Sequence, residues 1–209
     1  MTPNTRVALQ IVQHLDPGGI ETMALDLMRH AEADERMLII SLEGRKKPSL
    51  ERWPVLQPFA DNLIFLDKQP GWRAGLIWQL ARLMKSLGVS SVHTHHIGPL
   101  VYGGLAARLA GIKNRIHTEH DAWHLSSARR RRLQGAFLRL VSPILVADAE
   151  AVAQGIGIHW PGKSARIIRN GIDTHRFRPG SQRAARAKLG LPADAKLVGS
   201  SGRLESVKG

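Results

Sequence analysis

The chain has 209 residues, slightly more than one typical domain, and 43% of them are hydrophobic, which suffices for a sizeable core. It contains no cysteine, which excludes disulfides and thiolate chemistry, and no run of about 18 apolar residues that could cross a bilayer. The formal net charge of +13 indicates an anionic partner, but one Tyr, four Phe and the lack of a basic strand interleaved with aromatic residues argue against nucleic acid.

Apolar periodicity predicts an alternation of strands and helices along the chain. Strands are expected over residues 7–12, 37–42, 62–66, 89–95, 116–120, 144–147 and 166–169. Helices are expected over 20–31, 72–87, about 100–109 and 127–140, with a Lys- and Pro-rich loop over 44–58. Because strands separated by such helices need right-handed crossovers, the pattern predicts a doubly wound α/β domain with a mainly parallel sheet and helices on both faces.

The C-terminal part differs in composition and predicts a domain boundary. We expect a first domain over 1–178, a linker over 179–195 with a short basic helix at 183–189, and the start of a second domain over 196–209. Residues 198–209 are typical of a new strand that runs into a glycine-rich phosphate-binding loop. Because a strand needs neighbours, we expect the second domain to be truncated.

Polar residues and glycines follow five of the predicted strands. In sheets of this class, ligands bind at the carboxyl ends of the strands, where connections diverge to opposite faces, so these residues are the candidates for a site. They are Gly18 and Gly19 after the first strand, His95 and His96 after the fourth, His120 and Asp121 after the fifth, residues 148–150 after the sixth, and Asn170 and Gly171 after the seventh.

Gly18 and Gly19 lie between a strand and a helix, where a backbone without side chains can approach a pyrophosphate. A tight turn is the alternative interpretation. The segment lacks the spaced glycines of a dinucleotide-binding fingerprint, and the chain has no Walker loop.

Six histidines gather between residues 93 and 124, and they raise the question of a metal site. Neither cluster has the helical His-Glu-x-x-His arrangement, so no metal is expected. His120, which Asp121 follows, is the best placed to hydrogen-bond a substrate hydroxyl or share its proton, and a packing role is its alternative.

Two cations, Arg203 and Lys208, stand near the end of the chain between Gly202 and Gly209. Two cations at such a loop could neutralise a diphosphate as a leaving group takes on negative charge. Solvated charges on a surface turn are the alternative.

These motifs, taken in order, resemble those of the retaining enzymes of glycosyltransferase family 4. They are the Gly-Gly-x-Glu loop at 18–21, His-x-His-His at 93–96, Glu-His-Asp at 119–121, Arg-Asn-Gly-Ile-Asp at 169–173 with a following Phe and Pro, Gly-Arg-Leu at 202–204 and Lys-Gly at 208–209. The resemblance implies a GT-B architecture, in which two Rossmann-like domains face each other. The N-terminal domain then mainly binds the acceptor, and the C-terminal domain mainly binds a nucleotide-sugar donor.

The resemblance also implies roles for particular residues. Gly18 and Gly19 would meet the donor diphosphate, and His120 would lie near the transferred sugar. The residues that would line the cleft or contact the acceptor are His95, His96, Asp121 and Asn170. Arg203 and Lys208 would bind the diphosphate and assist its departure, so that neither a metal nor another cofactor is needed.

The implied reaction is transfer of a sugar, with retention of anomeric configuration, to an acceptor in cell-surface polysaccharide or glycolipid synthesis. We expect residues 1–209 alone to be inactive, because the family's spaced glutamate pair would lie after Gly209. A GT-B sugar-nucleotide epimerase and a non-catalytic protein that binds anionic surfaces remain as alternatives.

The densest basic cluster is Arg129 to Arg132, which precedes apolar residues at helical spacing. One interpretation is a helix that lies on anionic lipid headgroups, and the other is a helix whose apolar stripe packs into the core while its arginines are solvated. Since the first residues lack the apolar stretch of a signal peptide, we expect the protein in the cytoplasm, with peripheral contact at the inner face of the membrane.

Overall fold

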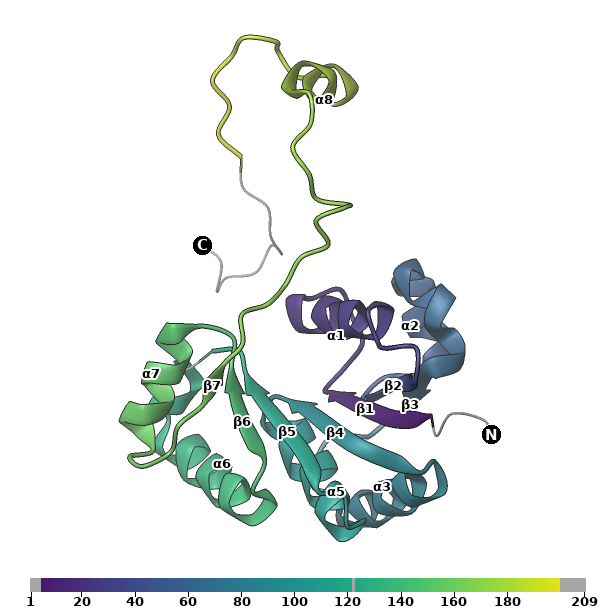
Figure 1. Ribbon diagram of the computed structural model, residues 1–209, viewed down its shortest axis with the longest axis vertical. Coiled ribbons are helices and arrows are strands. Elements are labelled where there is room, and N and C mark those ends of the chain that lie inside the picture. Colours follow the sequence, from purple (N-terminus) through teal and green to yellow (C-terminus); the bar gives the residue numbers. More distant parts are fainter. Residues whose placement is uncertain (1–4, 122, 200–209) are drawn as a thin grey trace. The chain divides into compact units, whose positions relative to one another are not determined.

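The computed structural model describes residues 5–121 and 123–199 (Figure 1). The chain divides into two units, Met1–Asn170 and Gly171–Gly209. Within the part of the second unit that the structure describes, the regular element is the short basic helix α8 (Gln182–Lys188), one residue earlier than expected. The Ser181 hydroxyl caps it by accepting a hydrogen bond from the backbone N–H of Ala184 at 3.2 Å.

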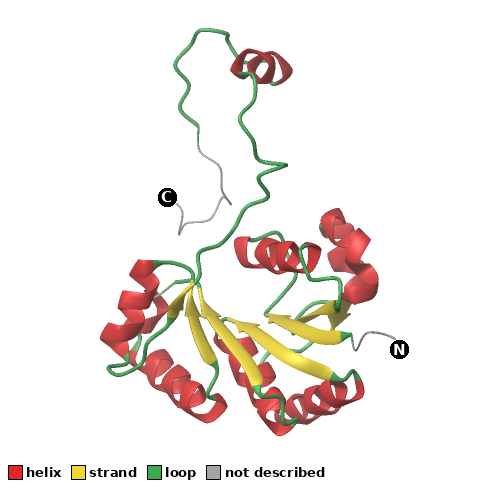
Figure 2. Cartoon of the chain, in the orientation of Figure 1, coloured by secondary structure: helices red, strands yellow, loops and turns green. Residues whose placement is uncertain are grey.

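The first unit contains a seven-stranded sheet in the order β3-β2-β1-β4-β5-β6-β7, and every strand pair is parallel (Figures 1 and 2). The strands are β1 (Arg6–Val12), β2 (Glu35–Ser41), β3 (Leu63–Phe65), β4 (Val89–His95), β5 (Asn114–Glu119), β6 (Ile144–Ala147) and β7 (Arg166–Ile167). This confirms the predicted α/β fold, with β4 and β6 at their predicted bounds.

Helices cover both faces of the sheet, and alternation along the strands divides the core accordingly. The helices described are α1 (Gly19–Arg29), α2 (Lys46–Arg52), η1 (Pro54–Asn62), α3 (Ala74–Ser86), α4 (Ile97–Pro99), η2 (Leu100–Gly104), α5 (Leu105–Leu109), η3 (Trp123–Ser126), α6 (Ala128–Val141) and α7 (Glu150–His159). In β2, Leu38 and Ile40 join the cluster with α3 and α5, whereas Ile39 joins the cluster with α1.

Residues 44–58 are not the expected loop, because α2 and the 3-10 helix η1 occupy most of them. Pro48 lies in the first turn of α2, where its missing N–H breaks no helical hydrogen bond. Leu56 is fully buried and anchors η1 to the core. The segment rich in lysine and proline therefore forms a short α-helix and the start of a 3-10 helix.

The helix α7 was not predicted either. Its two glycines, Gly155 and Gly157, lower helix propensity and obscure the pattern. Val152 and Ile156, one helical turn apart, are both buried, so tertiary packing stabilises the helix. At the other end of the prediction, Val198 and Gly199 lie in no strand, and residues 200–209 fall outside the described residues.

The topological switch point lies between β1 and β4, because the connections on the two sides of this point run in opposite directions along the sheet. From β1 the chain moves outward through β2 to β3, and it then returns to β4 on the other side of β1. The segment after β4 begins at α4, continues through the π-helical turn η2 and ends in α5. The buried Gly103 of η2 lies directly against the Ile11 side chain of β1.

Replacing Gly103 by Ala is expected to lower the free energy of unfolding by about 1–3 kcal/mol, because the new methyl group would overlap the fully buried Ile11 side chain. The matched control is Gly157→Ala in α7, where the added methyl meets open space and helix propensity raises stability by up to about 1 kcal/mol. Denaturant unfolding of both variants tests the prediction. Equal stabilities for the two would contradict it.

Candidate active site

A cavity of about 580 Å³ lies at the carboxyl ends of β1, β4 and β5. Its lining residues are Gln13, His14, His96, Ile97, Gly98, Asp121, Arg130 and Leu133. We call it the switch cavity, because the strand order reverses between β1 and β4. The strand-end rule thus brings two of the sequence candidates, His96 and Asp121, to one cavity.

His96 has a strained backbone, with φ 68° and ψ 166°. This region of backbone space is essentially reserved for glycine, and such strain concentrates at functional sites. His96 is also the residue at which β4 turns into α4. Its backbone conformation therefore sets how its own side chain and the first residues of α4 face the switch cavity.

Replacing His96 by Gly is expected to give a protein about 1 kcal/mol or more stabler than the His96→Ala variant, because only glycine relieves the backbone strain. Both variants lack the imidazole, so the comparison isolates the backbone. Thermal unfolding of the two variants measures the difference. If alanine were equally stable, the backbone at His96 would hold no strain.

A chain of hydrogen bonds beside the switch cavity connects Gln10 inside β1 with residues at or after the ends of β4, β5, β6 and β7. Nε2 of the fully buried His95 lies 2.7 Å from Oε1 of Gln10 in β1. Nδ1 of His95 lies 3.1 Å from Nε2 of His120, and Nδ1 of His120 lies 3.2 Å from Oδ2 of Asp148. The Asn170 amide donates to the same Asp148 oxygen at 3.5 Å. We call this chain the histidine relay.

The ring nitrogens of the relay allow a limited set of proton positions. The Asp148 carboxylate only accepts, so Nδ1 of His120 carries a proton. If His95 donates from Nε2 to Gln10, its Nδ1 accepts, and His120 must then be a doubly protonated imidazolium. If the Gln10 amide is rotated so that it donates, the same relay holds with His120 neutral. Gln10 is therefore coupled to the charge of His120.

Burial decides which histidines stay uncharged. It lowers the pKa of His95 well below the usual 6.5, and it lowers the pKa of His93 to about 3. Burial also lowers the pKa of His120, although the nearby Asp148 carboxylate opposes this shift. His120 is consequently the relay histidine whose charge its partners can still adjust.

Other histidines of the predicted cluster have structural partners. Nδ1 of His117 lies 2.9 Å from the Thr94 hydroxyl, and its Nε2 lies 2.8 Å from Glu119 Oε1. Nε2 of His93 lies 2.7 Å from the hydroxyl of Thr118. The contacts with the Thr94 and Thr118 hydroxyls join β4 to β5 within the sheet. Of the histidines in the cluster, His120 and His96 are therefore the ones that we consider for the site.

Gly18 has a local structural role. Its extended backbone caps α1, and a Cβ there would overlap the carboxylate of the buried Glu21. That carboxylate also lies 3.4 Å from Nδ1 of His14, which lines the switch cavity. Gly19 instead faces open space. The Glu of the Gly-Gly-x-Glu segment is thus a site residue that the sequence candidates omitted.

The four arginines of α6 do not form one surface. Arg130 lines the switch cavity, and Arg131 donates to the backbone carbonyl of Leu125 at 2.8 Å. Arg129, Arg130 and Arg132 are exposed, and Arg131 is half-buried. The apolar stripe is divided too, because Leu138 and Val141 are buried while Leu133 and Leu140 remain half exposed.

The sequence candidates that remain are Asn170, Arg203 and Lys208. Asn170 reaches the relay through Asp148, which sequence reasoning placed after the sixth strand without giving it a role. Gln10 had no sequence signal, because it lies inside β1. Arg203 and Lys208 lie outside the described residues. Among the described residues, no group of three or more His, Asp or Glu side chains could hold a metal ion.

The glycosyltransferase family 4 model matches residues 17–176, which include strands β2 to β7 and the His95, His96, His120, Asp121 and Asp148 side chains of the site. The D-inositol 3-phosphate glycosyltransferase of Mycobacterium leprae is 35% identical over 141 residues, 66% of this chain and 29% of that protein. The putative glycosyltransferase EpsF of Bacillus subtilis is 26% identical over 223 aligned positions, which span 100% of this chain and 56% of EpsF. The chain therefore spans from under a third to about half of the length of these curated relatives.

Two solved structures share the fold. HepE of Anabaena, solved with UDP and glucose, has a TM-score of 0.67 at 18% identity, over 88% of this chain and 50% of HepE. A glycosyltransferase of Rickettsia africae has a TM-score of 0.63 at 17% identity, over 91% of this chain and 51% of its own. These similarities agree with the parallel sheet described above.

Proposed function

Because this chain belongs to glycosyltransferase family 4, we propose that it forms the acceptor-side domain of an enzyme that transfers a sugar from a nucleotide-sugar to an acceptor with retention of configuration. The observation that carries the proposal is the switch cavity, with His96 and Asp121 in its wall and the His120–Asp148 pair beside it. A hydrogen-bonded imidazole at such a place can bind a sugar hydroxyl or stabilise charge that develops in transfer.

The donor would lie over the β1–α1 connection. We assign the contact with its diphosphate to Gly18 and Gly19 on this side, and to Arg203 and Lys208 in the segment that follows. HepE, which shares the fold, was solved with UDP and glucose, and this supports a nucleotide-sugar donor here. Two cations at the diphosphate would make a metal unnecessary.

The proposal is tested by assaying sugar transfer from UDP-glucose. We expect residues 1–209 alone to show no turnover, because they span only about half of EpsF and about half of HepE, which was solved with UDP and glucose. The longer protein that includes this chain is expected to give a product whose anomeric configuration, measured by NMR, equals that of the donor. Turnover by residues 1–209 would refute the expected inactivity of this chain alone. A product of inverted anomeric configuration would refute the retaining mechanism.

For the acceptor we propose a component of cell-surface polysaccharide or glycolipid, made at the cytoplasmic face of the membrane. The exposed Arg129 and Arg132 support contact with anionic lipid, whereas Arg130, which is also exposed, lines the switch cavity and Arg131 donates to a backbone carbonyl of the domain. Across the described residues, the helices are too short or too polar to span a bilayer. Any membrane contact of this part would therefore be peripheral.

Replacing both Arg129 and Arg132 by Ala is expected to weaken binding to anionic vesicles by roughly tenfold or more, since each surface cation contributes about 1 kcal/mol. The matched control is Arg6→Ala with Arg29→Ala, which removes the same charge from other elements. Cosedimentation with phosphatidylglycerol vesicles measures the change. Equal losses for both pairs would show that only net charge matters.

A further inference from the structure

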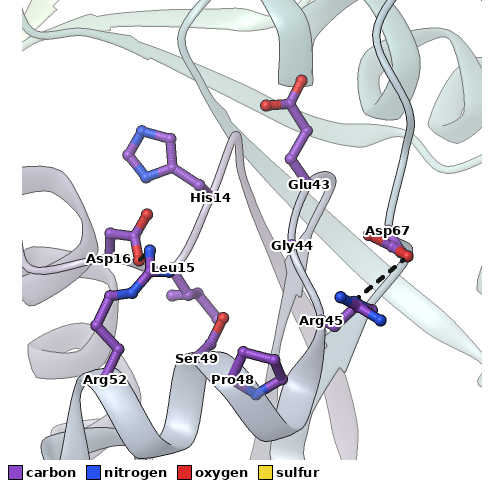
Figure 3. A pocket seen from close by; sticks show the side chains of 10 residues that line it. All are labelled: His14, Leu15, Asp16, Glu43, Gly44, Arg45, Pro48, Ser49, Arg52 and Asp67. Atoms are coloured by element: carbon purple, nitrogen blue, oxygen red, sulfur yellow. Dashed lines mark hydrogen bonds and ion pairs between the residues drawn. The ribbon is translucent and has the colours of Figure 1, made fainter.

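A second cavity adjoins the switch cavity, and His14 lines both (Figure 3). It has a volume of about 200 Å³ and lies at the carboxyl ends of β1, β2 and β3. Its lining residues are His14, Leu15, Asp16, Glu43, Gly44, Arg45, Pro48, Ser49, Arg52 and Asp67. We call it the outer cavity. A ligand that fills the switch cavity could extend past His14 into it.

The charges in the outer cavity are paired with one another. Arg52 Nη1 lies 3.1 Å from Asp16 Oδ1, and Arg45 Nε lies 4.0 Å from Asp67 Oδ2, as Figure 3 shows. The remaining carboxylate, Glu43, has Lys68 Nζ at 3.5 Å. The outer cavity therefore has no surplus of positive charge, although the chain carries a net charge of +13.

The switch cavity is balanced in the same way, with one carboxylate from Asp121 and one guanidinium from Arg130. The residues that line the two cavities together carry four carboxylates and three guanidinium groups, so a phosphate or carboxylate ligand would meet no excess of cationic groups there. Removing such a ligand from water costs free energy, and anion-binding sites offset this cost with a local excess of hydrogen-bond donors. The two cavities do not provide such an excess.

We propose that the acceptor is an uncharged oligosaccharide, whose reacting sugar lies in the switch cavity and whose next sugar lies in the outer cavity. This inference rests on the proposed function and names its acceptor class. A sugar hydroxyl both donates and accepts, so it can bridge a carboxylate and a guanidinium, as at Asp16 and Arg52. The exposed Pro48 supplies apolar surface for the C–H groups of a sugar ring.

The test is direct binding to residues 1–209, measured by saturation-transfer NMR with sugars as probes. The uncharged probes are glucose, maltose, cellobiose and lactose, and the anionic probes are glucose 1-phosphate and glucose 6-phosphate. We expect at least one disaccharide to bind more tightly than glucose, and neither phosphate to bind more tightly than glucose. Tighter binding of a phosphate, or no binding by any uncharged disaccharide, would overturn the proposal.

Variants locate the second sugar. Arg52→Ala is expected to weaken disaccharide binding by about fivefold or more and to leave glucose binding unchanged. The matched control is Lys47→Ala, which removes a cation of the same helix that does not line the cavity. If both variants behave alike, the outer cavity is not the subsite.

The two proposals fail in different ways. If a disaccharide binds as expected while the longer protein transfers no sugar, the proposed function is refuted and the binding class stands. If the longer protein transfers sugar to phosphorylated acceptors only, the function stands and the uncharged acceptor is refuted.

Discussion

Acidification from about pH 6.5 to about pH 5 is expected to reduce the free energy of unfolding by about 3 kcal/mol, through two buried histidines. His95 is fully buried, with a pKa well below 6.5, and the pKa of His93 is lowered to about 3. Small domains are stable by roughly 5–15 kcal/mol, so this loss is a large part of the total.

The direction follows from the proton uptake of the two states. In the unfolded chain each histidine binds a proton below its ordinary pKa of 6.5, whereas in the folded protein His95 and His93 stay neutral. Stability from these residues is therefore complete above pH 6.5 and is lost as pH falls, by about 1.4 kcal/mol per pH unit for each histidine. For His93 the loss ends near its folded pKa of about 3.

Guanidinium unfolding at a series of pH values measures this slope. Replacing His93 by Asn removes one of these protons and should reduce the slope by about 1.4 kcal/mol per pH unit, while His175→Asn, at an exposed position, should leave it unchanged. A stability that is flat over this pH range, or a slope that His93→Asn does not reduce, would show that these histidines are protonated in the folded protein.

The sequence predicts the fold well where burial is continuous and less well where packing decides. The run at β6, Ile-Leu-Val-Ala, suits a buried parallel strand, and β4 has the β-branched Val89, Val92 and Thr94 at intervals; the bounds of both strands agree with the structure. The helices α2 and α7 contain proline or glycine, and tertiary contacts of a few residues stabilise them. Local patterns cannot report such contacts.

The same distinction holds for the site. The strand-end rule identifies His96, His120 and Asp121, because it depends only on where strands end. It cannot find Gln10, which lies inside β1 and meets His95 only because β1 and β4 pair in register, with Gln10 opposite His93. Nor can it choose Arg130 from four consecutive arginines, because the packing of α6 sets which one faces the cavity.

If the proposed function holds, replacing Asp148 by Asn is expected to lower kcat/KM for sugar transfer by a protein that contains this chain and a complete donor site by about a hundredfold or more, the scale at which proton-transfer groups contribute. The carboxylate accepts from Nδ1 of His120 and raises its pKa against the effect of burial. Without that charge, the pKa of His120 falls further. Asp148 is thus a positioning residue, which acts through His120.

The pH profile separates this role from a merely structural one. If activity requires protonated His120, the limb of the activity–pH profile that reports the His120 pKa should move to lower pH in Asp148→Asn. The ¹⁵N NMR signals of the His120 ring nitrogens should report the altered tautomer. The matched control is Glu150→Gln, which removes a carboxylate two residues away that pairs with exposed Arg169 at the surface. Unchanged kcat/KM in Asp148→Asn, with wild-type stability in both variants, would exclude the histidine relay from the reaction.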